Sequence, residues 1–152
     1  MRADTPVTIL IAEDDLDDRL LTKEALVEAR LSNDLRFVGD GDELLDYLRH
    51  RGHYRDPASS PRPGLILLDL NMPRKDGRET LRELKSDPDL RHIPVIVLTT
   101  SRSEGDVRRC YELGGNSYIT KPTSFNGLVE TLIALGKYWL EIAELPLDGA
   151  EH

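Results

Sequence analysis

Five short runs rich in leucine and β-branched residues constrain the fold of this chain more than any other feature of its sequence. The runs are Val7–Ile11, Leu35–Val38, Leu65–Leu68, Val95–Leu98 and Ser117–Ile119, and longer segments of helical periodicity separate them. Such alternation is typical of repeated strand–helix units and predicts a mostly parallel sheet with helices packed on it. Because the second and fifth runs contain more polar residues, we expect them nearer the edges of the sheet.

The segments between the runs carry the signals of helices. Four residues share one face of the first predicted helix, and we expect that face to cover the sheet: Leu16, Leu20, Val27 and Leu31. Asp40, Asp76 and Ser103 each stand where a capping side chain starts one of the next three helices. Residues 51–63 mix charges with prolines and are predicted to form a long surface loop before the third strand.

The length and composition predict one domain and disfavour several classes of partner. A chain of 152 residues is within the usual size of a single domain. It has neither a run of about eighteen apolar residues nor a leader typical of secretion, so we expect a soluble, cytoplasmic protein without membrane contacts. The net charge of −8 disfavours nucleic acid as a partner, since binding to phosphates needs a basic surface. The single cysteine, Cys110, is interpreted as a small buried thiol.

Polar side chains follow four of the predicted strands, at the point where each strand ends. Glu13 and Asp14 come after the first run, Asp69 after the third, Thr99 after the fourth and Lys121 after the fifth. Doubly wound sheets bind their ligands outside the carboxyl ends of the strands, so we expect these side chains to converge. Clustered carboxylates suit a hard cation such as Mg²⁺, and a lysine and a hydroxyl suit the oxygens of a phosphoryl group. The set therefore indicates phosphoryl chemistry assisted by a metal.

With these residues in this order, residues 7–133 resemble the receiver domains of two-component response regulators. The segment 68–77, LDLNMPRKDG, is similar to the loop that carries the phosphoacceptor in that family. The resemblance implies an α/β fold of the flavodoxin-like type, a doubly wound five-stranded parallel sheet in the order 2-1-3-4-5 with helices on both faces. It also implies a signalling protein that assists only its own phosphorylation and dephosphorylation, and not an enzyme.

The resemblance assigns the acidic residues to phosphorylation and metal binding. Asp69 is the expected phosphoacceptor. Glu13, Asp14, Asp69 and the backbone carbonyl of Asn71 are the expected protein ligands of Mg²⁺. The acid pair is Glu-Asp where many members of the family have Asp-Asp, a difference that alters reach and keeps the charge. The third acid, Asp15, is expected to face solvent or to cap the first helix.

The resemblance also implies how a signal leaves the site. Lys121 is expected to contact the phosphoryl group, aimed by a bond to Pro122 that is usually cis in the family. Thr99 and Tyr118 are the expected switch pair, in which the hydroxyl moves toward the phosphoryl group and the ring turns inward. Thr100 is larger than the small residue common at its position, which is expected to affect the rate of phosphoryl transfer.

A closer resemblance is to phytochrome-associated response regulators, which work with light-sensing histidine kinases. The proline-rich loop before the third strand and the ending KYWLEIAELP, residues 137–146, carry this resemblance. It implies a histidine kinase partner of the bacteriophytochrome type. We accordingly divide the chain into a receiver domain, residues 1–135, and an extension of the last helix with a tail, residues 136–152.

The last helix has more apolar residues than one buried stripe requires. One strip comprises Leu128, Leu132, Leu135, Trp139 and Ile142, and a second comprises Val129, Ile133 and Leu140. This excess predicts a homodimer. Its expected interface includes Leu128, Trp139, Leu140 and Ile142. The alternative is that the tail folds back on its own domain.

Other interpretations of the site compete with signalling. An enzyme of the haloacid dehalogenase type also forms an aspartyl-phosphate, but it needs a second acid two residues after the nucleophile, where this chain has Asn71. A receiver-like module that ignores phosphorylation would not need Asp69, the acid pair, the threonine and the lysine together. A nucleotide site is disfavoured because no phosphate-binding loop follows the first strand. Taken alone, Thr99 could simply be the last residue of a strand. Tyr118 and Trp139 could each be an aromatic residue of the core.

Overall fold

The five strands form one parallel sheet at the centre of the molecule. The computed structural model describes residues 7–31 and 34–146. The strands are β1 (Thr8–Ala12), β2 (Asp34–Val38), β3 (Leu65–Leu68), β4 (Val95–Thr99) and β5 (Ser117–Thr120). All neighbouring pairs are parallel, in the order β2-β1-β3-β4-β5. The predicted fold class and strand order are therefore confirmed, with the two more polar runs at the edges.

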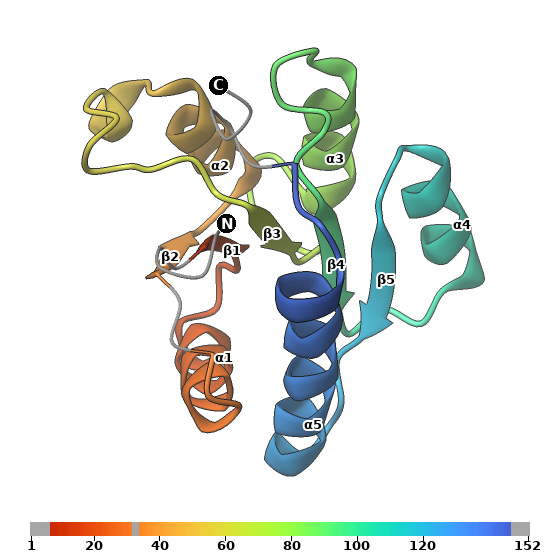
Figure 1. Ribbon diagram of the computed structural model, residues 1–152. Helices are drawn as coiled ribbons and strands as arrows, with labels where there is room; N and C mark the ends of the chain where they lie inside the picture. The colour runs from red at the N-terminus through yellow and green to blue at the C-terminus, as the bar shows by residue number, and fades with distance from the viewer. Residues whose placement is uncertain (1–6, 32–33, 147–152) are drawn as a thin grey trace.

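Helices cover both faces of this sheet (Figure 1). They are α1 (Leu16–Glu28), α2 (Gly41–Arg49), α3 (Gly77–Ser86), α4 (Glu104–Glu112) and α5 (Phe125–Gly136). A 3₁₀ turn follows α2 at Gly52–Tyr54, and a π-helical turn continues α5 at Lys137–Ile142. Helices α1 and α5 lie side by side on one face, and the other three lie on the opposite face. In the described ranges 7–31 and 34–146, no helix has the length and apolarity that crossing a membrane requires.

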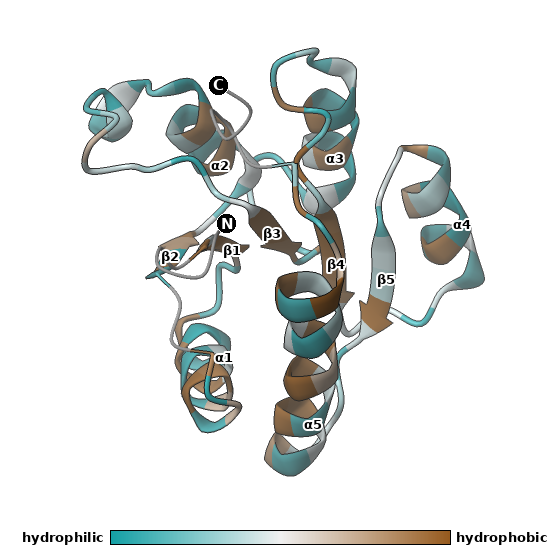
Figure 2. Cartoon of the chain, in the orientation of Figure 1, coloured by the Kyte–Doolittle hydropathy of each residue, from teal (hydrophilic) through white to brown (hydrophobic). Residues whose placement is uncertain are grey.

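Side chains of the central strands alternate between two apolar clusters, as expected of strands covered on both faces. Leu10 and Ile66 belong to the cluster under α2, α3 and α4, whereas Ile9 and Leu67 belong to the cluster under α1 and α5. Figure 2 shows hydrophobic colours on β3 and β4 at the centre and a mixture of hydrophobic and hydrophilic colours on the helices. Cys110 is buried in the first cluster, as predicted, and burial raises the pKa of its thiol.

Helix α1 turns a different face to the sheet from the predicted one. Leu16, Leu20 and Val27 are 74%, 56% and 64% exposed, and only Leu31, beyond the helix, packs partly against the core. The buried residues of α1 are Thr22, Ala25 and Leu26. Their spacing also marks one helical face, and two of them are small, which suits close approach to the sheet. Because apolar residues occur on several faces of this helix, its periodicity does not single out the buried one.

Capping side chains begin the helices as predicted. The Asp40 carboxylate accepts a hydrogen bond from the Glu43 N–H at 2.8 Å, at the start of α2. Asp76 caps α3 and Ser103 caps α4 in the same way. Asp15 caps α1 and is also exposed to solvent, so both roles expected of it are present. These caps fix where each loop after a strand ends and its helix begins.

The predicted surface loop, residues 51–63, is tied to the domain at several points. The Tyr47 hydroxyl donates a hydrogen bond to the Pro61 carbonyl at 2.7 Å. The Arg36 side chain on β2 donates to the Ser59 carbonyl at 2.8 Å. These bonds anchor the loop beside edge strand β2.

The C-terminal part of the last helix is only partly exposed. Leu128 is 9% exposed and belongs to the cluster under α1 and α5, so the expectation that it lies in an interface is corrected: it is a core residue of its own chain. Trp139 and Leu140 are half-buried against the same cluster, whereas Ile142 is 60% exposed. The stripe thus becomes more exposed toward its C-terminal end.

The tail returns toward the domain after the π-helical turn. Leu145 is buried within the single chain, which agrees with the alternative that part of the tail folds back. Of the predicted extension 136–152, residues 147–152 lie outside the described residues.

Candidate functional site

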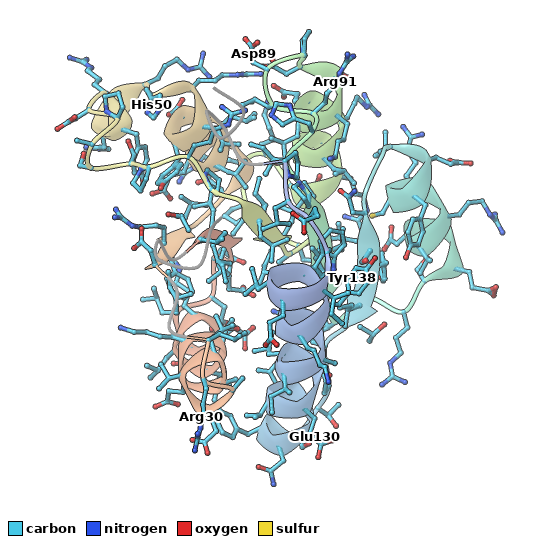
Figure 3. The ribbon with its side chains drawn as sticks, in the orientation of Figure 1. Arg30, His50, Asp89, Arg91, Glu130 and Tyr138 are labelled. Carbon is cyan, nitrogen blue, oxygen red and sulfur yellow. The ribbon has the colours of Figure 1, made fainter. Side chains whose placement is uncertain are left out.

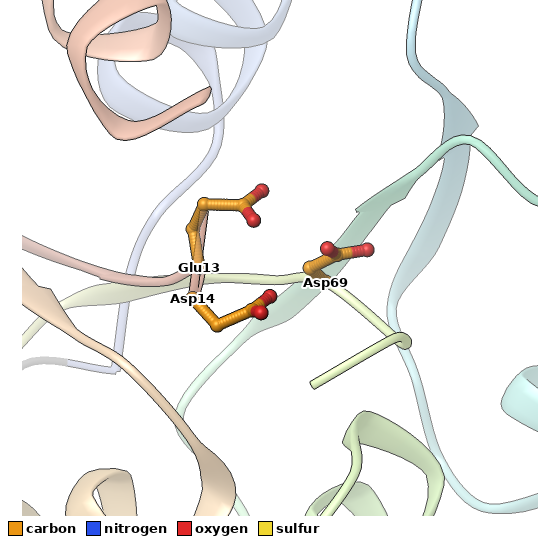
Figure 4. Close-up of side chains that lie close together, drawn as sticks. All are labelled: Glu13, Asp14 and Asp69. Atoms are coloured by element: carbon orange, nitrogen blue, oxygen red, sulfur yellow. The ribbon is translucent and has the colours of Figure 1, made fainter. Parts of the chain in front are cut away.

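Three carboxylates gather at the carboxyl ends of β1 and β3. Glu13 and Asp14 follow β1, Asp69 follows β3, and these two strands are neighbours in the sheet. Each of the three residues has a carboxylate oxygen within 4.8 Å of the other two (Figure 4). Glu13 and Asp69 are buried and Asp14 is exposed, so the cluster opens to solvent on one side. The convergence expected from the sequence is therefore present.

Four contacts fix the backbone and side chain of Glu13. Its N–H donates to the Val38 carbonyl at 2.9 Å, and its carbonyl accepts from the Arg19 side chain at 2.7 Å. One carboxylate oxygen accepts from the Asp15 N–H at 3.1 Å, and the other pairs with Lys121. Burial raises the pKa of Glu13, and Lys121 opposes this effect.

Lys121 brings a positive charge into the acidic cluster from the end of β5. Its Nζ lies 2.5 Å from Glu13 Oε1, 3.9 Å from Asp18 Oδ2 and 4.0 Å from Asp69 Oδ2. Burial alone would lower the pKa of Lys121, but these carboxylates outweigh it and raise the pKa. The bond to Pro122 is trans, which corrects the expected cis geometry. A trans bond is the ordinary preference before proline, and the lysine reaches the acids from it.

The loop between β3 and α3 is held close beneath Asp69. Leu70 and Met72 are buried on either side of the exposed Asn71, whose role as a carbonyl ligand stays a prediction. Gly77 donates its N–H to the Leu70 carbonyl at 2.9 Å. A Cβ atom at Gly77 would lie 2.3 Å from the Asp69 carbonyl oxygen. Only glycine therefore lets the start of α3 approach the loop this closely.

The donor set fits a hard divalent cation. Three carboxylates and one ammonium group leave the cluster with excess negative charge, and oxygen ligands at this spacing are those that Mg²⁺, Ca²⁺ or Mn²⁺ prefers. A cation there would relieve the repulsion between buried Asp69 and its neighbours.

Comparison with known proteins identifies the family. Residues 9–133 match the model of the response regulator receiver domain. This chain belongs to the response regulator receiver family. It is thus a signalling protein of the two-component type, and the family predicted from the sequence is confirmed.

Several relatives of this receiver have been solved. Response regulator Rcp1 of Synechocystis sp. is 44% identical over 141 residues, which cover 93% of this chain and 94% of Rcp1. The Mn²⁺-bound form of Rcp1 superposes with a TM-score of 0.84. The phosphorylated cyanobacterial phytochrome response regulator RcpA is 43% identical, with a TM-score of 0.86 over 94% of this chain and all of its own. RPA3017, of red light signalling in R. palustris, is 42% identical, with a TM-score of 0.88 over 93% of this chain and 99% of its own.

The two residues predicted as the receiver's switch pair meet at Ser101. Thr99 is fully buried, and its Oγ1 accepts from the Ser101 N–H at 3.5 Å. The Tyr118 ring packs partly against the cluster under α4, and its hydroxyl donates to the Ser101 carbonyl at 2.9 Å. The Tyr118 N–H donates to the Tyr111 hydroxyl on α4. The sequence did not single out Ser101, because an isolated serine after a strand carries no pattern of its own.

An ion pair joins this segment to α3, the helix that follows the loop after Asp69. Arg78 on α3 donates through Nε and Nη2 to the two carboxylate oxygens of Asp106 on α4, at 2.8 and 2.7 Å. The Ser101 hydroxyl also donates to Asp106, at 2.7 Å. The hydrogen bonds from Arg78, the larger cause, and from Ser101, the smaller one, lower the pKa of Asp106 to about 2. Nothing local in the sequence indicates that Asp106 has a partner 28 residues away.

Thr100 is exposed beside the lysine. It lines a groove of about 210 Å³ together with Asp18, Lys121, Pro122 and Phe125, among others. The predicted effect of its size on phosphoryl transfer stays a prediction.

Proposed function

We propose that this receiver accepts a phosphoryl group on Asp69 from a histidine kinase, in a Mg²⁺-dependent reaction, and that phosphorylation alters its contacts with other proteins. The observation that carries the proposal is the gathering of Glu13, Asp14 and Asp69 beside Lys121. Each of these groups has a use in phosphoryl transfer.

The chemistry follows from the positions of the side chains. A carboxylate oxygen of Asp69 attacks the phosphorus of a phosphohistidine, a P–O bond forms, and the P–N bond breaks with its electron pair returning to the imidazole. Mg²⁺, when bound, supplies positive charge against the charge that builds up on the phosphoryl oxygens. Glu13 and Asp14 would hold it together with Asp69 and the Asn71 carbonyl. Lys121, 4.0 Å from Asp69 Oδ2, is within reach of a phosphoryl oxygen.

We infer that the kinase is of the bacteriophytochrome type. RcpA is a phytochrome response regulator and RPA3017 acts in red light signalling, and this chain is more than 40% identical to both over nearly its full length. Related response regulators can bind the same class of kinase when the surfaces that contact the kinase are alike.

A phosphotransfer assay tests the acceptor, the metal and the kinase together. Radiolabelled bacteriophytochrome kinase is mixed with the receiver, with Mg²⁺ or with EDTA, beside a histidine kinase that lacks a phytochrome module. Transfer is expected only with Mg²⁺, faster from the phytochrome kinase, and absent in Asp69→Asn. Equal labelling of Asp69→Asn would contradict the acceptor, and equal rates from the two kinases would contradict the partner.

Thr99 and Tyr118 are proposed to carry the signal through Ser101. A phosphoryl group on Asp69 offers the Thr99 hydroxyl a charged acceptor, and a shift of that hydroxyl would move the Ser101 backbone that both residues contact. Thr99→Ala is therefore expected to be phosphorylated and yet to show a weaker change in its protein contacts. Limited proteolysis or hydrogen exchange of α4, with and without acetyl phosphate, measures that change. An undiminished response in Thr99→Ala would contradict the coupling.

The homodimer is proposed to form through the end of the last helix, where Trp139 and Leu140 are half-buried. Ile133, Tyr138 and Ile142 are about half exposed or more there, and Figure 3 shows Tyr138 at the C-terminal end of the helix. A contiguous group of exposed apolar side chains can mark a surface that a partner covers, and these residues are the candidates for such a group.

Sedimentation of the full chain tests the dimer. Ile142→Glu is expected to shift the population toward monomer, whereas Lys137→Glu, a charge change at a neighbouring exposed position, is expected to leave it unchanged. A parent protein that stays monomeric at high concentration, phosphorylated or not, would exclude the dimer.

A further inference from the structure

An ion pair at some distance from the acids joins the phosphoacceptor loop to helix α2. Asp40 caps α2 through one carboxylate oxygen, and its side chain is only 2% exposed. The other oxygen accepts from Arg74 Nε at 2.8 Å and from Arg74 Nη2 at 2.5 Å. Burial raises the pKa of Asp40, but the Glu43 N–H and Arg74 outweigh it and hold the pKa below its usual value. Without Arg74, the buried Asp40 carboxylate would keep its negative charge and would have too few hydrogen-bond donors to stabilise it.

The loop takes an unusual backbone conformation where it meets α2. Arg74 has a φ of 60°, which residues other than glycine seldom adopt. The next carbonyl, of Lys75, accepts from the Gly41 N–H at 2.9 Å, and a Cβ atom at Gly41 would lie 2.7 Å from that carbonyl oxygen and 1.9 Å from Thr80 Oγ1. The tip of the loop therefore contacts the start of α2 directly. The Arg74 guanidinium binds the Asp40 carboxylate beside this contact.

The same contact bridges the two halves of the acidic cluster. The loop begins at Asp69 and includes Asn71, the predicted carbonyl ligand. Asp40 follows β2 closely, and the last residue of that strand, Val38, accepts the Glu13 N–H at 2.9 Å. One side of the ion pair is thus connected to Asp69, and the other side to Glu13.

We propose that the Arg74–Asp40 ion pair is a positioning contact that sets the spacing of the phosphoacceptor loop from the acid pair, and so the affinity of the site for its divalent cation. The inference rests on the proposed function, because it concerns the metal that phosphoryl transfer uses. Groups that hydrogen-bond to metal ligands orient those ligands in other sites, and their loss costs about tenfold or more in metal affinity. The Arg74–Asp40 pair would act one contact further out, through the backbone of the loop and of Val38.

The test measures metal binding directly. Isothermal titration of the full chain with Mn²⁺ is carried out on the parent, on Arg74→Gln and on Arg36→Gln. Arg36 pairs with Asp34 at 3.0 Å on the edge strand, which makes it a matched arginine–aspartate control remote from the acids. Arg74→Gln is expected to weaken Mn²⁺ binding about tenfold, and Arg36→Gln to leave it within twofold.

Two further readouts separate positioning from stability. In EDTA, the N–H of Gly41 should exchange hydrogen faster in Arg74→Gln, and the urea midpoint of this variant measures the loss of stability that comes with an unpaired, buried Asp40. At saturating Mg²⁺ the rate of labelling by acetyl phosphate should recover toward the parent rate, since the defect lies in affinity. If Arg74→Gln fails to fold, Asp40→Asn, which keeps an oxygen for the helix cap, takes its place.

The outcomes distinguish the two proposals. Mn²⁺ binding by Arg74→Gln within twofold of the parent overturns the positioning role and leaves the proposed function standing. A parent protein that binds no Mn²⁺ overturns both. A loss of affinity that is equal in Arg36→Gln assigns the effect to general stability and also overturns the positioning role.

Discussion

Removing the guanidinium of Arg78 should destabilise the receiver by an amount that depends on pH. The Arg78–Asp106 pair has the two-pronged geometry of a strong ion pair and joins α3 to α4. Arg78, with the Ser101 hydroxyl as the second cause, lowers the pKa of Asp106 from 3.8 to about 2, and the whole of this shift corresponds to about 2.4 kcal/mol at full strength. Because the pair is partly exposed to solvent, screening reduces this, and we expect Arg78→Gln to lower the free energy of unfolding by about 1 kcal/mol at pH 7.

The pH dependence follows from the direction of the shift. A carboxylate whose pKa is lowered in the folded state stabilises that state above the unfolded pKa, and the stabilisation disappears as the pH falls toward the folded value. The difference in free energy of unfolding between the parent and Arg78→Gln should therefore disappear between about pH 4 and pH 2. These limits are the pKa values of Asp106 in the unfolded and the folded state.

Urea unfolding followed by circular dichroism at several pH values measures both effects. Arg109→Gln is the control, because Arg109 and Glu112 form an exposed pair at 4.0 Å on α4, for which we expect at most about 0.5 kcal/mol. Equal destabilisation by the two substitutions, or a difference between parent and Arg78→Gln that stays constant down to pH 3, would refute the reasoning.

Three further predictions concern packing and backbone, each measured as the free energy of unfolding in urea. Leu26→Ala should cost about 3 kcal/mol and Leu20→Ala less than about 0.5 kcal/mol, since only the first is buried in α1; similar losses would contradict the observed face. Gly77→Ala should cost about 2 kcal/mol and slow phosphorylation of Asp69, because its methyl group would collide with the backbone of Asp69. Phosphorylation at the parent rate would show that the loop can shift to make room. Tyr118→Phe should cost about 1 kcal/mol through the lost hydroxyl bond, and an unchanged stability would argue that this bond is weak.

Much of the fold was predictable because the signals are local. Runs such as Leu65–Leu68 are apolar throughout, as a strand covered on both faces must be, and Asp40 and Asp76 cap helices with bonds that span three residues. The residues of the site were predictable for a related reason. Parallel strands end at one edge of a sheet, so acids after β1 and β3 and a lysine after β5 had to converge once the sheet formed.

Contacts between distant segments were not predictable in this way. Ser101 stands out only because Thr99 and Tyr118 both reach its backbone. Asp40 was predictable as a helix cap, but its ion pair with Arg74, 34 residues later, was not. Such a pair leaves no periodicity in the sequence, since side chains at that separation meet only when the elements pack.

The sequence alone determined the order of strands and helices, the central place of the most apolar strands, and the chemical groups at the site, because each depends on residue type and short spacing. Only the tertiary structure decided which face of α1 is buried, that Leu128 is core, and how the loop between β3 and α3 is held by Arg74 and Asp40. A helix with apolar residues on several faces can bury any of them, and the neighbouring elements select one by the space that they leave.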